Sequence, residues 1–207
     1  MIKKSIYPKT TRLGRHKTTV TITEKLDGSN LVFFKHPVSE ELWIAQRNRM
    51  YRLSQIDGPE VSQGMLKGLY GWLKEHGESL RDELHAGSAV VGEWLGMGRI
   101  KYDLDKMNRF HIFAKANVSK DLEVYNIKYD NELFIYPFKE QIIPNYMSVV
   151  PTVVTLMAFP SIEFVDDLYD DYVECIERDV EGFCISDGQI VRKYVRMKNG
   201  QFQEHKA

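Results

Sequence analysis

The sequence contains only two cysteines, Cys175 and Cys184, and this scarcity excludes two kinds of stabilised fold. The pair lacks the close spacing of zinc ligands, and no histidines cluster beside it. A disulfide framework needs more cysteines than this and an oxidising compartment. We therefore expect a reduced, cytoplasmic protein without a zinc site.

A long hydrophobic run is also absent. The most apolar segment, Val149–Phe159, is interrupted by Pro151 and by threonines, and it is shorter than the roughly 20 residues that span a bilayer. The first residues, Met1–Lys4, carry no apolar stretch of the kind found in a signal peptide. These absences predict a soluble protein with no membrane partner.

An excess of positive charge is the third absence. Charged residues make up 28% of the chain, but the formal net charge is -1. A globally basic, nucleic-acid-coating surface is thereby excluded, so any phosphate binding must come from a local patch. The segment Lys3–Lys17 contains basic residues and no acid. It is either a frayed terminus or a phosphate-contacting strip.

What the sequence does have is material for a core, since 43% of its 207 residues are hydrophobic and 12% are aromatic. We expect a single domain over residues 1–207, of the α+β class with mainly antiparallel sheet. Helical spacing predicts helices over Pro59–Leu84 and Val165–Arg178. A hairpin is expected to join Gly182–Ser186 to Ile190–Lys198 around the turn Asp187-Gly188. Further strands are expected at Thr18–Thr23, Leu31–Phe34, Leu42–Gln46, Ser88–Trp94, Arg109–Phe113, Val124–Phe138 and Pro151–Met157.

The strongest chemical signal is the string EKLDGSN at residues 24–30. Lys25 follows one predicted strand and precedes a tight Asp-Gly turn, so a rigid edge projects its amine toward a cleft. The alternative is an ordinary hairpin with a solvated lysine. A lysine in water is almost entirely protonated at neutral pH. A nucleophilic role therefore requires cations, a metal ion or desolvation nearby.

The string resembles the first motif of the covalent nucleotidyltransferases, the superfamily of DNA ligases, RNA ligases and mRNA capping enzymes. The resemblance implies that Lys25 attacks the α-phosphate of a nucleotide and becomes a lysyl-nucleotide. Glu24 and Asn30 look more like the RNA ligase branch, and the resemblance places both among the nucleotide-binding residues. The basic segment near Tyr7 is similar to RNA ligases as well.

Later strings resemble further motifs of the same superfamily in the same order. Arg47, in QRNR, resembles an arginine that contacts phosphate, although a surface basic pair is the alternative. Glu93, in GEWLG followed by IKY, resembles the acid that contacts the ribose. Phe113 resembles the phenylalanine that stacks on adenine, with Phe110 as the alternative, because alternation puts the two on opposite faces of a strand.

The last two motifs supply an acid and two cations. Glu181, in EGFCI, resembles the glutamate that organises the divalent metal, and Glu93 is its expected partner carboxylate. Arg196 and Lys198, in VRMKN, resemble a pair of lysines that contact the α-phosphate. Because arginine does not give up its proton near neutral pH, any acid role falls to Lys198. In a strand the two cations share one face.

The resemblance implies an ATP-grasp-like ligase adenylation domain, with antiparallel sheets flanking a nucleotide cleft. It implies an ATP-dependent RNA ligase that uses Mg²⁺ or Mn²⁺ and seals 5′-phosphate and 3′-hydroxyl ends. RNA is the expected substrate, and a nicked duplex or DNA stays open. No appended C-terminal domain is expected, so the chain is a minimal ligase, a truncated piece, or one that a partner protein completes. Rival functions are an ATP-dependent DNA ligase, a GTP-using capping guanylyltransferase and a non-catalytic, decayed protein that binds nucleic-acid ends.

Overall fold

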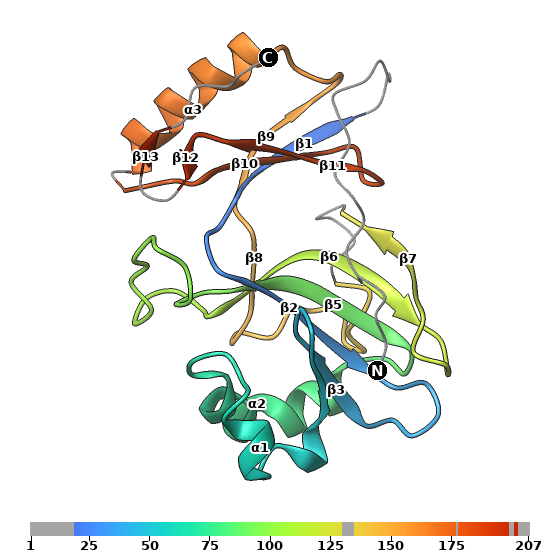
Figure 1. Ribbon diagram of the computed structural model, residues 1–207. Helices are drawn as coiled ribbons and strands as arrows, with labels where there is room; N and C mark the ends of the chain where they lie inside the picture. The colour runs from blue at the N-terminus through green and yellow to red at the C-terminus, as the bar shows by residue number, and fades with distance from the viewer. Residues whose placement is uncertain (1–18, 130–134, 177, 199–200, 203–207) are drawn as a thin grey trace.

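The computed structural model describes residues 19–129, 135–176, 178–198 and 201–202, with the backbone alone for 197–198 and 201–202. The described chain forms two main sheets stacked as layers, with a helical layer on the outer face of each (Figure 1). The order of layers is α3, the smaller sheet, the larger sheet, and then α1 with α2. This arrangement confirms the α+β class and the mainly antiparallel sheets.

The larger sheet contains seven strands, of which six follow the order β4-β3-β2-β5-β6-β7, and β8 pairs with β6. Its pairs are antiparallel except for the short parallel pair of β6 with β8. The central strands are buried on both faces, which explains their long apolar runs. The strands are β2 (Ser29–Lys35), β3 (Leu42–Ala45), β4 (Met50–Arg52), β5 (Ser88–Trp94), β6 (Phe110–Val118), β7 (Val124–Lys128) and β8 (Ser148–Val149).

Helix α2 (Leu69–Glu83) covers the outer face of the larger sheet, with η1 (Leu53–Gln55) and α1 (Pro59–Ser62) beside it. The Trp72 ring stacks on Phe33 of β2 at a centroid distance of 5.2 Å. The prediction of one helix over Pro59–Leu84 was wrong, because the helix stops after α1 and restarts at Leu69. Gly68 accounts for the break, since it lies in the left-handed region at φ 81°, which favours glycine.

The smaller sheet has the order β11-β10-β1-β9 and is antiparallel throughout. Helix α3 (Ile162–Ile176) lies on its outer face, where Val165 and Tyr169 pack against Val20 and Ile22. The expected hairpin around Asp187-Gly188 is confirmed. Its second strand ends earlier than predicted, at Val195, and a separate two-stranded pair of β12 with β13 follows. The strands are β1 (Val20–Glu24), β9 (Thr152–Leu156), β10 (Gly182–Ser186), β11 (Val191–Val195), β12 (Met197–Lys198) and β13 (Gln201–Phe202).

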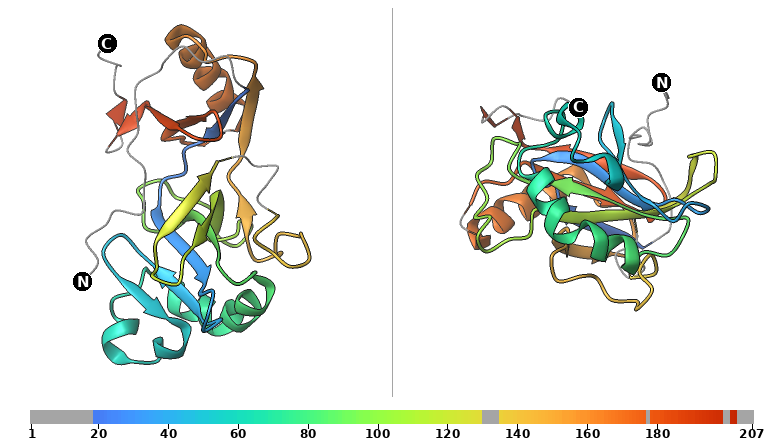
Figure 2. Two further views of the ribbon diagram at one scale, coloured as in Figure 1. Left: turned by 90° about the vertical axis from the view of Figure 1, so that its right-hand side faces the viewer. Right: turned by 90° about the horizontal axis from the view of Figure 1, so that it is seen from below.

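Two connections join the sheets, one from β1 to β2 and one from β8 to β9 (Figure 2). They lie against each other, because the backbone N–H of Glu24 donates to the carbonyl of Pro151 at 2.9 Å. The predicted nucleophile, Lys25, occupies the first connection. Its position between the two layers is therefore set by the topology.

The inner faces of the two sheets change character along the strands. Val191 of the smaller sheet packs against an apolar cluster of the larger sheet that includes Val32 and Val91. Two residues farther along the same strands, the inner face of the larger sheet carries Asn30 and Glu93 instead. The layers are thus held together by apolar contacts at one end and present polar groups at the other. Within the described residues, no helix is both long enough and apolar enough to cross a membrane.

Candidate active site

Lys25 is held as an extension of the smaller sheet. Its backbone N–H donates to the carbonyl of Gly182 at 2.8 Å, so the pairing of β1 with β10 continues one residue past β1. The side-chain Nζ donates to a carboxylate oxygen of Glu181. The two side chains are 18% and 20% exposed, so the pair is reachable from solvent. Two predicted site residues that lie far apart in the sequence are therefore in direct contact.

Glu93 approaches the same point from the larger sheet. It pairs in register with Asn30 of β2, and their side chains share the inner face. Burial raises the pKa of Glu93 to about 7, while the charges of Lys25 and Lys193 oppose this rise. The charge of Glu181 adds to the rise, and a hydrogen bond from the Gly28 backbone opposes it. Glu93 therefore belongs to the same electrostatic cluster as Lys25 and Glu181.

Cys184 also lies in this cluster, but its chemistry is different. Burial raises the pKa of its thiol to about 11, despite the nearby charges of Lys25 and Lys193. A thiol with this pKa is protonated at neutral pH and is a poor nucleophile. Lys25 therefore stays the predicted nucleophile of the cluster.

Phe113 lies on the inner face of the larger sheet because β6 is irregular at this point. The register shifts between Val91 and Gly92, so that Gly92 pairs with Ile112 and Val91 pairs with Ala114. Phe113 is the extra residue of this bulge, and it packs toward Leu26, next to Lys25 in the chain. Phe110 lies on the other face, fully buried and edge-on to Phe33 at 4.9 Å. Phe110 and Phe113 therefore lie on opposite faces of β6, as expected.

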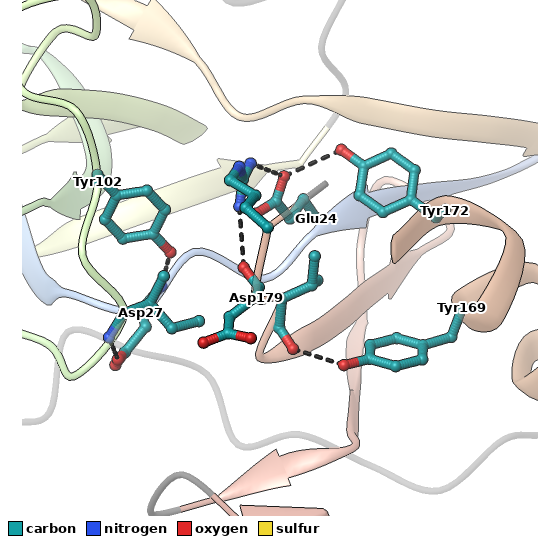
Figure 3. Close-up of polar contacts among 9 residues, drawn as sticks. Glu24, Asp27, Tyr102, Tyr169, Tyr172 and Asp179 are labelled. Atoms are coloured by element: carbon teal, nitrogen blue, oxygen red, sulfur yellow. Dashed lines mark hydrogen bonds and ion pairs between the residues drawn. The ribbon is translucent and has the colours of Figure 1, made fainter. Parts of the chain in front are cut away.

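Glu24 is anchored on the outer side of the smaller sheet. It is 1% exposed, and both of its carboxylate oxygens accept hydrogen bonds from Arg178, each at 2.7 Å. The hydroxyl of Tyr172, on α3, donates to the same carboxylate at 2.9 Å (Figure 3). A buried carboxylate with a bidentate arginine and a third donor is fully satisfied. The backbone at the end of β1 is therefore fixed immediately before Lys25.

Asp27 anchors the other side of Lys25. Its backbone N–H donates to the hydroxyl of Tyr102 at 2.8 Å, and its carboxylate accepts the backbone N–H groups of Arg99 at 2.5 Å and Ile100 at 3.0 Å. The Arg178 guanidinium lies 5.5 Å from the centre of the Tyr102 ring, which connects the two anchors. In Figure 3, Tyr102 lies beside Asp27, and Tyr172 lies beside Glu24. The backbone on both sides of Lys25 is thus fixed.

Of the three predicted cations, Arg196 and Arg47 lie outside this cluster, and the side chain of the third, Lys198, is not described. Arg196 extends toward α3, where it forms ion pairs with Asp166 at 2.8 Å and Asp170 at 3.7 Å. Arg47 is exposed in the turn between β3 and β4. The side chain of Lys198 lies outside the described residues. Phosphate contact by these three residues stays a prediction.

Sequence reasoning missed several residues that the structure brings to the site. Arg178 and Tyr172 were assigned only to the helix predicted over Val165–Arg178, and Lys193 only to the strand predicted over Ile190–Lys198. The signal for Arg178 was its position as a base within an acidic stretch, three residues before Glu181. The signal for Lys193 was alternation in β11, which places it on the same face as Val191.

The donor groups suit a metal that is shared with a ligand. Among the described residues, no group of three or more histidine, cysteine or acidic side chains has the arrangement of a metal site. Two carboxylates, those of Glu93 and Glu181, are near enough for their charges to interact. Mg²⁺ typically uses one or two carboxylates together with substrate phosphates and water. The residues present fit that mode.

Two facing antiparallel sheets, with a lysine at their junction and a carboxylate from each side, define a nucleotidyltransferase fold of the ligase type. Residues 18–198 match the family model described as RNA ligase, and the chain belongs to this family. A search of curated protein sequences gave no significant match.

Solved structures of low sequence identity share the fold. An archaeal ATP-dependent RNA ligase matches with a TM-score of 0.53 and 15% identity over 91% of this chain and 48% of that one. A mutant of Naegleria gruberi RNA ligase with ATP and Mn matches with a TM-score of 0.53 and 15% identity, over 91% of this chain and 56% of that one. The chain spans about half the length of these structures.

Proposed function

We propose that this chain is an ATP-dependent RNA ligase domain that joins 5′-phosphate and 3′-hydroxyl ends through a lysyl-AMP on Lys25. The observation that carries the proposal is the contact of the Lys25 amine with Glu181, beside Glu93 and between the two sheets. Membership of the RNA ligase family supports the same function. The Naegleria structure with ATP and Mn supports ATP as the nucleotide.

In the first step, the neutral amine of Lys25 attacks the α-phosphorus of ATP. The N–P bond forms, the bond from the α-phosphorus to the bridging oxygen breaks, and pyrophosphate leaves with the electron pair. The amine loses its proton, for which the carboxylate of Glu181 is the adjacent acceptor. When bound, Mg²⁺ or Mn²⁺ supplies charge neutralisation at the phosphates, and Glu181 and Glu93 would hold it. Positioning and electrostatics provide most of the catalysis in such transfers.

The nucleotide has a matching set of contacts in this arrangement. Phe113 would stack on the adenine, since it lies on the inner face beside Leu26. Glu93 would accept a hydrogen bond from the ribose, and Asn30, its neighbour in register, lies within reach of the same group. The AMP then passes to a 5′-phosphate end, and a 3′-hydroxyl displaces it to seal the strand. Both later steps are again phosphoryl transfers.

The test is the intact mass of the protein after exposure to nucleotide. The purified protein is first treated with pyrophosphate and Mg²⁺ to remove any bound AMP, and then mixed with ATP or GTP. We expect a mass gain of one AMP with ATP, none with GTP, and none in Lys25→Ala. Lys120→Ala is the matched control, because Lys120 is exposed in the turn after β6. Absence of the adduct in the unaltered protein would overturn the proposal.

The substrate is tested separately with the adenylylated protein. We expect transfer of AMP to 5′-phosphate RNA and sealing to a 3′-hydroxyl, with weaker sealing of the matched DNA ends. Equal or better sealing of DNA would replace the RNA ligase assignment with a DNA ligase. An adduct with GTP in the first assay would indicate a guanylyltransferase instead.

A further inference from the structure

Basic side chains gather at one end of the larger sheet, outside the space between the two sheets. At this end β5 finishes and β6 begins, and the loop that leads into α2 lies beside the loop that joins these two strands (Figure 1). The indole N–H of Trp94, the last residue of β5, donates to the carbonyl of Lys67 at 3.1 Å. This bond fixes the loop before α2 against the sheet, and the Lys67 side chain is exposed there.

Arg109 joins the two loops. Its guanidinium lies across Gly68 and Gly96, because a Cβ added at these positions would lie 3.2 Å and 3.3 Å from its Nη1 atom. Both glycines have a positive φ, 81° and 93°, which side chains rarely adopt, so neither position covers the guanidinium. The carbonyl of Arg109 accepts the N–H of Leu95 at 2.8 Å, and its side chain is half-buried. The guanidinium is therefore positioned before any ligand arrives.

Arg49 extends the group of cations along the loop before α2. A Cβ at Gly64 would overlap the Arg49 guanidinium, so this side chain lies directly over the glycine. Gln46 ties the turn between β3 and β4 to the same loop, because its side chain donates to the Gly64 carbonyl at 3.4 Å and accepts a later backbone N–H at 3.1 Å. Arg49, Lys67 and Arg109 thus follow one another along one loop. We refer to these three residues as the basic edge.

The charges of the basic edge are not neutralised by the residues that the structure describes. None of the three side chains makes a hydrogen bond or an ion pair with any of them. The first turn of α2 contains no acid, and Asp57, before α1, is held by Lys74 and Tyr70. Glu60 is exposed on α1 and pairs with none of the three cations. Positive charge is therefore concentrated here, in a chain whose formal net charge is -1.

The chemistry of the basic edge suits the phosphates of a nucleic-acid strand. Two of its members are arginines, whose planar guanidinium groups match the oxygens of a phosphate, and lysine supplies a point charge. Contacts of this kind position a strand without reading its sequence. The edge also lies close to the predicted nucleophile along the chain of contacts. Gly96, under Arg109, is three residues before Arg99, whose backbone N–H bonds to Asp27 beside Lys25.

We propose that the basic edge binds the sugar–phosphate backbone of the RNA strand, outside the nucleotide cleft. This inference rests on the proposed function, in which RNA is the strand that is sealed. Arg49, Lys67 and Arg109 hold the strand across the end of the larger sheet, next to the loop that anchors Asp27. They form no covalent bond and contact neither ATP nor the reacting atoms.

The first experiment measures binding of a labelled, single-stranded 5′-phosphate RNA by fluorescence anisotropy at a series of salt concentrations, without ATP. We expect Lys67→Ala and Arg109→Gln each to weaken binding by about tenfold, as for loss of one charge-assisted contact. Each change should also reduce the slope of log affinity against log salt by about 0.7, the value for one phosphate on a single strand. Arg109→Lys keeps the charge and should retain most of the slope.

Two matched controls lie away from the basic edge. Lys120→Ala changes an exposed lysine in the turn after β6, and Arg81→Gln changes an arginine in the last turn of α2, at the other end of that helix. Both should bind RNA as the unaltered protein does. Unchanged affinity and slope in Lys67→Ala and Arg109→Gln overturn the inference, and so does the absence of measurable RNA binding by the unaltered protein.

The same variants are then tested on the matched DNA strand. The losses should be equal on RNA and DNA, because the phosphates are common to both. A loss confined to RNA would mean that these side chains contact the ribose hydroxyl, and it would overturn the inference. Tighter binding of DNA by all the proteins, with equal losses, would count against RNA as the substrate and would support the role of the basic edge.

The last experiment separates RNA binding from nucleotide chemistry. Arg109→Gln should raise the RNA concentration for half-maximal transfer of AMP from the adenylylated protein by about tenfold, and the rate at saturating RNA should be kept. Formation of lysyl-AMP from ATP should not slow. An equal loss in the ATP step would mean a structural role and would overturn the inference. If the unaltered protein forms no adduct, the proposed function fails, and the anisotropy measurement still decides the role of the basic edge.

Discussion

Replacing Glu93 with glutamine should make the protein more stable at alkaline pH. Burial raises the pKa of this carboxyl to about 7 from its ordinary 4.5, so the folded state holds the proton more tightly than the unfolded state does. The folded protein therefore binds more protons between these two values, and the free energy of unfolding falls as pH rises through them. The contribution of the neutral carboxyl is fully present below about 4.5 and is lost above about 7.

The size of this effect follows from the same two pKa values. At 1.36 kcal/mol for each pH unit, the difference amounts to about 3 kcal/mol of stability lost at high pH. Glutamine has nearly the same shape and is neutral at every pH. Glu93→Gln should therefore match the unaltered protein near pH 5 and exceed its free energy of unfolding by about 3 kcal/mol near pH 8.5.

The assay is urea unfolding at a series of pH values, with EDTA present and no nucleotide. Glu140→Gln is the control, because Glu140 is exposed, and this change should give no pH-dependent difference. The competing outcome is that Lys25 and Lys193 stabilise the ionised carboxylate enough to offset its burial. In that case Glu93→Gln would be less stable than the unaltered protein at high pH. A flat difference across the pH series would contradict the reasoning equally.

Three further changes test how the backbone around Lys25 is held. Arg178→Ala leaves the buried carboxylate of Glu24 without its cation and should lower the free energy of unfolding by about 3 kcal/mol in urea titrations, whereas the double change with Glu24→Gln should lower it less. Gly182→Ala places a Cβ against a backbone carbonyl of β11 and should lower the free energy of unfolding by about 2 kcal/mol in the same titrations. Gly71→Ala is the control, because Gly71 faces open space on α2, and this change should not lower the free energy of unfolding. Tyr102→Phe removes the acceptor of a backbone N–H and should lower the midpoint of thermal unfolding, with about 1 kcal/mol lost. An unchanged midpoint would mean that the Tyr102 hydroxyl does not help to anchor the backbone at Asp27.

The residues that end strands were predictable from the sequence, because local chemistry fixes them. An acid at the end of an apolar strand, such as Glu93, needs a polar surrounding, and an Asp-Gly pair marks a turn. Sequence patterning therefore placed Lys25 and Glu93 at strand ends, and the fold then brought them close enough for their charges to interact. The contact of Lys25 with Glu181 spans 156 positions in the chain, and only the resemblance to a family linked the two.

The face on which a strand residue lies could not be predicted in the same way. Alternation separates neighbours, but it does not say which face is inner. It separated Phe110 from Phe113 and left open which of the two lies between the sheets. The bulge in β6 then puts Phe113 and Ala114 on the same inner side, which strict alternation forbids. Such irregularities depend on pairing with β5, and pairing is a property of the tertiary structure.

Anchoring of the backbone on both sides of Lys25 has a consequence for the reaction. Glu24 is tied to Arg178 and Tyr172, and Asp27 is tied to the loop after β5, so the main chain has little freedom at the nucleophile. The side chain, by contrast, is about one-fifth exposed and has one carboxylate contact. In the proposed reaction, the amine would leave Glu181 by rotation about its side-chain bonds, with no movement of the backbone. A fixed backbone thus limits the amine to the positions that its own side chain can reach around Glu181, and such positioning is what the proposed covalent transfer requires.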